Sequence, residues 1–154
     1  MNVIKANKTH KEHVLILLDN FRDVCYKICK IDPNFHSESA RKLGGELFDK
    51  YIESCDFAIF LAMDGEKYIG VSTVYKIPLV RKGVYDAEII EFYVEEEFQG
   101  TGTAQLLMDS VVNWARENNI CTIELESDNE LLRAHRFYEK YGFKNHAKGF
   151  KLIL

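Results

Sequence analysis

The stretch "FQGTGTAQ" constrains this chain more than any other, because it places two glycines at the entrance of a predicted helix. Gly100 and Gly102 are two of only nine glycines in 154 residues. Glycine costs conformational entropy on folding, so it is found where the backbone needs a shape that other residues resist. Residues 85–94 before it are rich in β-formers, and the residues after it carry an apolar stripe of helical spacing. The chain therefore predicts a strand, a glycine loop and a helix in succession.

This arrangement is typical of a site for an anion. The first amides of a helix have no internal partner, and the helix dipole adds partial positive charge to them, which suits a pyrophosphate. A Walker loop is excluded, because it needs a lysine and a hydroxyl residue after its last glycine, whereas Thr103-Ala104 follow Gly102. A dinucleotide fingerprint is excluded as well, because Gln105 stands where its third glycine belongs.

The rest of the chain predicts a single α/β domain, residues 1–154, built on a mixed sheet with helices on its faces. Asp64-Gly65 between two β-rich runs indicates a hairpin. Ser127 and Glu130 have the spacing of a capping box, and Gly142 is placed to end the last helix. The predicted strands are 3–6, 57–63, 67–76, 85–94, 120–125, 143–146 and 149–154. The predicted helices run from Thr9 to Asp32-Pro33-Asn34, from Ser37 or Ser39 to Ser54, from the glycine loop to Asn118-Asn119, and from Ser127 to Tyr141.

Bulk composition excludes several classes of function. A net charge of −4 argues against a general nucleic-acid binder. The cysteines form no C-x-x-C pair, so reduced, packed thiols are expected, and no set of histidines and acids has the spacing of a metal site. No apolar run reaches the length of a membrane span or of a signal core. We therefore expect a cytoplasmic protein with no metal and no nucleic-acid or membrane partner.

Gln99-x-x-Gly102-x-Ala104 and "AHRFYEKYGF" (134–143) are two motifs that resemble signatures of the GNAT family of N-acetyltransferases. The first is similar to the family's Q/R-x-x-G-x-G/A signature, and the other is similar to its second hallmark, a helix with Ala and Tyr four apart before Gly-Phe. The predicted order of elements, β-α-α-β-β-β-α-β-α-β-β, also matches the family. The resemblance implies a mixed, mostly antiparallel sheet of about seven strands with helices on both faces. It also implies transfer of an acetyl group from acetyl-coenzyme A to a primary amine by direct attack within a ternary complex.

The resemblance further implies where coenzyme A binds. The pantetheine arm would pair with Phe92, Tyr93 and Val94, where this strand splays from strand 120–125, and an amide near Tyr93 or Val94 would polarise the thioester carbonyl. The pyrophosphate would lie on backbone amides of the glycine loop, with added contacts from its two threonine hydroxyls. The residues of this loop are Gln99, Gly100, Thr101, Gly102, Thr103 and Ala104.

The chain departs from the family pattern at two positions of this site. Leu131 stands where many members carry Asn or Arg, so Asn129 or Arg133 is expected to make that coenzyme contact. Gln99 replaces the commoner Arg, which removes one positive charge near the phosphates.

Acid–base groups are also implied by the resemblance. An alkylamine with a pKa of about 10.4 must lose a proton before it attacks, and a carboxylate can accept that proton. Glu91 and Glu88 are the candidates, and Glu91 is preferred; strand alternation predicts that they lie on opposite faces. Tyr138 matches the family's tyrosine that protonates the leaving thiolate.

The sequence leaves the amine open. In the family the acceptor site is shaped by the first two helices and the loop after the hairpin, here residues 9–54 and 77–86. Four glutamates could form a negative wall, which favours a cationic small molecule or peptide such as a polyamine, an aminoglycoside or a protein lysine. They are Glu88, Glu91, Glu124 and Glu126. A homodimer is a further expectation, and the alternative function is a non-catalytic module that binds acyl-coenzyme A or a protein partner on the same fold.

Overall fold

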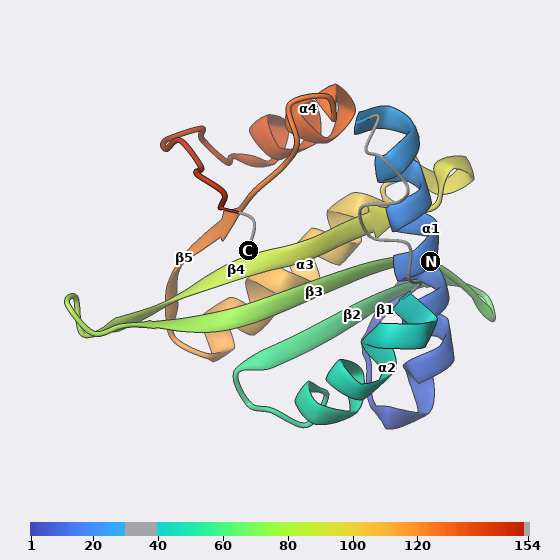
Figure 1. Ribbon diagram of the computed structural model, residues 1–154, viewed down its shortest axis with the longest axis horizontal. Coiled ribbons are helices and arrows are strands. Elements are labelled where there is room, and N and C mark those ends of the chain that lie inside the picture. The colour runs from blue at the N-terminus through green and yellow to red at the C-terminus, as the bar shows by residue number, and fades with distance from the viewer. Residues whose placement is uncertain (30–39, 153–154) are drawn as a thin grey trace.

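A tight turn at Gly65 joins two strands at the centre of the structure. Gly65 has φ +60°, a region that favours glycine, which is why Asp64-Gly65 predicted the hairpin correctly. The computed structural model describes residues 1–29 and 40–152, and in this part of the chain the hairpin belongs to a five-stranded sheet of order β1-β2-β3-β4-β5 (Figure 1). All neighbouring strands are antiparallel except β4 and β5, which are parallel. The strands are β1 (Asn2–Lys5), β2 (Phe57–Asp64), β3 (Lys67–Leu79), β4 (Val84–Val94) and β5 (Ile120–Leu125).

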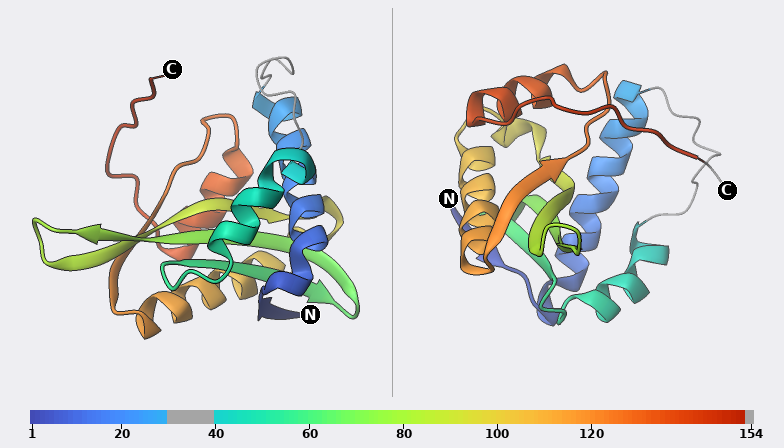
Figure 2. Two further views of the ribbon diagram at one scale, coloured as in Figure 1. Left: turned by 60° about the horizontal axis from the view of Figure 1, so that its bottom comes forward. Right: turned by 90° about the vertical axis from the view of Figure 1, so that its left-hand side faces the viewer.

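Helices cover both faces of this sheet (Figure 2), as the apolar stripes predicted. The described helices are α1 (Lys11–Cys29), α2 (Ala40–Tyr51), α3 (Thr103–Glu117) and α4 (Leu132–Tyr141), with the 3-10 turns η1 (Lys8–His10) and η3 (Glu96–Phe98). None of these described helices is long and apolar enough to span a membrane.

Two hydrophobic cores hold the helices to the sheet. Successive side chains of β2 point to opposite faces, so Phe60 packs under α3 whereas Leu61 packs under α1 and α2. On α3, Leu107 and Val111 are fully buried in the first core. Each such side chain contributes about 1.5–3 kcal/mol by leaving water. The two cores therefore fix the sheet between α3 and α4 on one side and α1 and α2 on the other.

The last two predicted strands are absent from the described residues. Residues 144–152 form no regular structure, and Phe150 and Leu152 are 96% and 83% exposed. An alternating apolar pattern favours a strand only where a neighbouring strand supplies hydrogen bonds, and no strand pairs with this segment. The prediction of about seven strands is therefore wrong for the described part of the chain, which has five; residues 153–154 lie outside it.

Several predicted helix boundaries differ from the structure, and α2 ends at Tyr51 rather than near Ser54. Asn7, not Thr9, caps the first helical turn, and α1 itself begins at Lys11. The capping box at Ser127 is also wrong, because α4 starts at Leu132 with no side-chain cap. The stop at Asp32-Pro33-Asn34 and the start at Ser37 or Ser39 lie outside the described residues. By contrast, Asn118 and Gly142 end α3 and α4 as predicted.

The loop predicted at residues 77–86 is mostly strand. β3 continues to Leu79 and β4 begins at Val84, so that only residues 80–83 form the turn. Pro78 is tolerated there because the pairing of β3 with β2 ends at Phe57 and Tyr75, so no strand on that side needs the amide that proline lacks.

We expect Leu107→Ala to destabilise the protein by about 2–5 kcal/mol, because it removes a fully buried side chain from the core under α3. Leu106→Ala is the matched control, since its side chain is 42% exposed on the same helix and should cost less than about 1 kcal/mol. Urea unfolding of both variants measures the difference. Equal losses of stability would contradict this packing.

Candidate active site

The parallel strands β4 and β5, at one edge of the sheet, separate midway along β4. The pairing of β4 with β5 ends at Ile89 and Leu125, so residues Ile90–Val94 have no strand on that side. Figure 1 shows β5 turning toward α4 while β4 continues toward α1. This confirms the splay that was expected between strands 85–94 and 120–125. Backbone groups of Ile90–Val94 that face away from β3 have no partner strand and can pair with an extended ligand as a strand would.

The glycine loop follows at the end of β4. Gly100 and Gly102 have φ +86° and +95°, conformations that side chains resist. The Gln99 side chain donates a hydrogen bond to the Val94 carbonyl at 2.8 Å, which fixes the loop to the end of the strand. The backbone bonding of α3 starts with the Leu106 amide, which donates to the Gly102 carbonyl at 3.1 Å. The amides before Leu106 therefore lie at a helix entrance where an anion can accept from them.

The two threonine hydroxyls of the loop bond to each other, to the loop backbone and to the sulfur of Met1, which lies 2.9 Å from the Thr103 hydroxyl. The Thr101 hydroxyl donates to the Phe98 carbonyl at 2.6 Å and lies 2.9 Å from the Thr103 hydroxyl. The Thr103 side chain is buried. These contacts of the threonine hydroxyls hold the shape of the loop in this structure.

Arg133 brings a positive charge from α4 to this loop. A Cβ built on Gly100 would lie 3.7 Å from a guanidinium nitrogen of Arg133. Asn129 lies exposed in the turn before α4, and no hydrogen bond of the described residues joins it to the loop. Of the two candidates to compensate for Leu131, Arg133 is the one that lies beside Gly100.

Tyr138 lies on α4 against the unpaired part of β4. Its ring meets Phe92 edge-on at 6.1 Å between centroids, and it also packs on Phe137 and Phe143. Burial raises the pKa of its hydroxyl to about 12, with a smaller contribution from Cys25. No hydrogen bond of the described residues involves that hydroxyl. The Tyr138 hydroxyl is thus neutral at physiological pH and can donate a hydrogen bond.

Glu88 and Glu91 lie on the same face of the sheet, so the expectation of opposite faces is wrong. Across the strand pair, Thr73 lies opposite Glu91 and Tyr75 lies opposite Glu88, with Ile90 inserted as an extra residue. Opposed residues point to the same side, and residues two apart on one strand share a face. The β-bulge at Ile90 therefore shifts the alternation by one and brings both carboxylates to the side of α1.

Glu91 has the more unusual environment of the two. Its amide donates to the Thr73 hydroxyl at 3.1 Å, whereas no described side chain donates to its carboxylate. Burial raises the pKa of the Glu91 carboxyl to about 7. Glu88 is half-buried and lies opposite Glu124 in the β4–β5 register, and Glu124 is 3.7 Å from the imidazole of His146.

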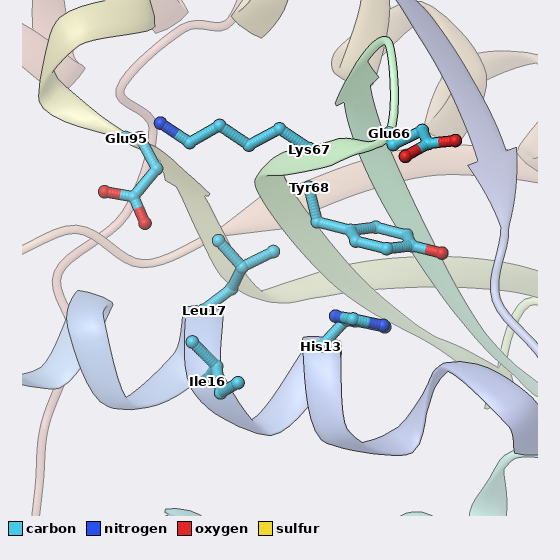
Figure 3. A pocket seen from close by; sticks show the side chains of 7 residues that line it. All are labelled: His13, Ile16, Leu17, Glu66, Lys67, Tyr68 and Glu95. Atoms are coloured by element: carbon cyan, nitrogen blue, oxygen red, sulfur yellow. The ribbon is translucent and has the colours of Figure 1, made fainter.

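A cavity of about 360 Å³ lies elsewhere, between α1 and the start of β3 (Figure 3). Its wall includes His13 stacked on Tyr68 at 4.0 Å, and Glu95, which accepts hydrogen bonds from Asn20 and Tyr93. Neither candidate base nor Tyr138 lines it. The candidate site is therefore not this cavity but the parted edge of β4, that is, the residues Ile90–Val94 that no longer pair with β5.

Comparison with known proteins assigns the family. Residues 24–143 match the model of the acetyltransferase (GNAT) family. N-acetyltransferase 8B of Homo sapiens is 26% identical over 107 residues, which are 68% of this chain but only 46% of that protein. An uncharacterised N-acetyltransferase of Mycobacterium bovis is 30% identical over 111 residues, 71% of this chain and 68% of the relative. An aminoglycoside acetyltransferase from an uncultured soil sample shares the fold with a TM-score of 0.80 at 15% identity, covering 99% of this chain and 97% of that one.

The chain therefore belongs to the GNAT family, and its class is that of the N-acetyltransferases. Its α/β fold is GNAT-like, with the five strands and four helices described above.

The pH dependence of the protein's stability should report the protonation state of Glu91. A glutamate in the unfolded chain has a pKa of about 4.3, whereas burial raises the pKa of Glu91 to about 7. The wild type should therefore lose stability as the pH rises between these two values. The Glu91→Gln variant cannot ionise at this position. Its free energy of unfolding minus that of the wild type should therefore be larger at pH 8 than at pH 5. Urea unfolding of both proteins at the two pH values measures this, and a difference that does not change with pH would contradict the assigned burial.

Proposed function

We propose that the protein transfers an acetyl group from acetyl-coenzyme A to a primary amine by direct attack within a ternary complex. The observation that carries this proposal is the meeting of three features at one edge. They are the unpaired strand Ile90–Val94, the glycine loop at its end, and the hydroxyl of Tyr138 against Phe92. When bound, the coenzyme would supply a thioester as the acetyl donor.

The residues present fit coenzyme A. Amides of residues 99–104 would hold the pyrophosphate at the entrance of α3, and Arg133 supplies the cation that Gln99 lacks. Backbone groups of Phe92, Tyr93 and Val94 would pair with the pantetheine arm. An amide of Tyr93 or Val94 would then donate to the thioester carbonyl, where negative charge develops.

Glu91 is the base that the environment favours. A base works best when its pKa lies near the pH of the reaction, and the Glu91 carboxyl, at about 7, is closer to this than an ordinary glutamate. It would accept the proton of the ammonium group, directly or through a water molecule. Glu88, on the same face, is the second candidate.

Tyr138 would act on the leaving group rather than on the attacking amine. Its neutral hydroxyl can donate a hydrogen bond or a proton to the sulfur as the thiolate leaves. The side chain is held for this role by ring contacts with Phe92, Phe137 and Phe143.

A cationic amine is the acceptor class that the charges favour. Glu88, Glu91 and Glu124 lie together by strand register, and Glu126 follows β5. Polyamines, aminoglycosides and protein lysines all carry the positive charge that such a wall attracts. Incubation of acetyl-coenzyme A with a library of these amines, with detection of the released thiol, tests this. Silence with every amine, despite tight coenzyme binding, would instead favour the non-catalytic alternative.

Two substitutions should separate binding from chemistry. Gly102→Val should weaken coenzyme A binding at least about tenfold, because a Cβ there meets no protein atom within 4 Å and would crowd the phosphates. Tyr138→Phe should leave that affinity unchanged but lower kcat by about 100-fold, since it removes only the acid. Calorimetry and steady-state kinetics on both variants measure this.

Gly65→Val is the control for backbone strain, because Gly65 also has a positive φ, of +60°, but lies in the β2–β3 turn. It should bind coenzyme A as the wild type does. Unchanged affinity in Gly102→Val, or unchanged turnover in Tyr138→Phe, would contradict the respective assignment.

A further inference from the structure

Two serine hydroxyls are buried without any hydrogen-bond partner among the described residues. They belong to Ser72 and Ser127. An unsatisfied buried hydroxyl costs about 1–3 kcal/mol, so each one calls for an explanation. Ser72 is fully buried on β3, which is paired with β2 on one side and with β4 on the other. Ser127 differs from it in position.

Ser127 stands on the β5 side of the gap described above. It follows Leu125, the last residue of β5 that pairs with β4, by two positions. If the parallel register continued, residues 126 and 127 would lie opposite Ile90 and Glu91, but the strands have parted there. Ser127 therefore stands across the gap from the free backbone groups of Ile90–Val94.

Asp128 makes two interactions in the segment 126–131, which carries Ser127. The Leu131 amide donates to the Asp128 carbonyl at 3.0 Å, and the Asp128 carboxylate lies 3.5 Å from the Cys29 thiol at the end of α1. Ser127 takes no part in capping α4, whose first residue is Leu132. Its hydroxyl thus has no structural function in the described fold.

We propose that Ser127 is a cofactor-binding residue, whose hydroxyl hydrogen-bonds to an amide of the pantetheine arm of acyl-coenzyme A. The inference rests on the proposed function. The arm carries peptide-like amides, and β4 can satisfy only those polar groups that face it. A hydroxyl both donates and accepts, so Ser127 can satisfy a group that faces the other side. Because the hydroxyl is covered in the free protein, the segment 126–131 must move outward for the contact to form.

Calorimetry with two ligands tests this inference. The first is coenzyme A, and the second is its 3′-phosphorylated ADP part, which lacks the pantetheine arm. Ser127→Ala should weaken coenzyme A binding by about 5- to 10-fold, the value of one hydrogen bond, and leave binding of the shorter ligand unchanged. Ser72→Ala, the matched control, removes an equally unsatisfied hydroxyl and should change neither affinity. Neither alanine variant should melt below the wild type without ligand, because each loses an unpaired polar group.

Wild-type affinity of Ser127→Ala for coenzyme A would overturn the inference and leave the proposed function intact. Equal weakening of both ligands would also overturn it, since the effect would then lie at the phosphate loop. A wild-type protein that binds neither ligand would overturn the proposed function and this inference together.

Discussion

Backbone amides and carbonyls within a sheet need hydrogen-bond partners, and β4 meets this need differently in its two halves. From Tyr85 to Ile89 it is paired on both sides, with β3 and with β5. From Glu91 to Val94 only β3 pairs with it, so no strand supplies hydrogen bonds to the outer row of polar groups. The other features of the site are arranged around this row: the glycine loop at its end, α4 with Tyr138 beside it, and Ser127 across from it.

The bulge at Ile90 coincides with the end of the pairing between β4 and β5. The extra residue turns the side chains on either side of it, so that Glu88 and Glu91 both face α1 while Phe92 faces α4. The proposed base and the proposed acid thereby approach the parted edge from opposite sides of the sheet. Burial keeps Tyr138 protonated and raises the pKa of Glu91 toward neutrality, which gives the two groups separate roles.

Local patterns predicted much of this structure. The Asp64-Gly65 turn, the stripe on α3 and the Gly142 cap each follow from neighbouring residues, and each is present. The features that were missed depend on contacts distant in sequence. No local signal marks the bulge at Ile90. The solvent exposure of Phe150 depends on whether a neighbouring strand lies beside it. Ser127 and Glu130 have the spacing of a capping box, but α4 begins only at Leu132 and has no side-chain cap. The family motifs identified the loop and the tyrosine, but only the structure showed on which face each glutamate lies.

Hydrogen–deuterium exchange with and without coenzyme A tests most directly whether the parted edge of β4 is the cofactor site. Amides of Ile90–Val94 that face away from β3 should exchange more slowly when the coenzyme is bound at saturation, because the pantetheine arm replaces the missing strand. Amides of residues 71–73 on β3, which are paired on both sides already, should not change. If saturating coenzyme A leaves the exchange of Ile90–Val94 unaltered, the cofactor does not bind along this edge.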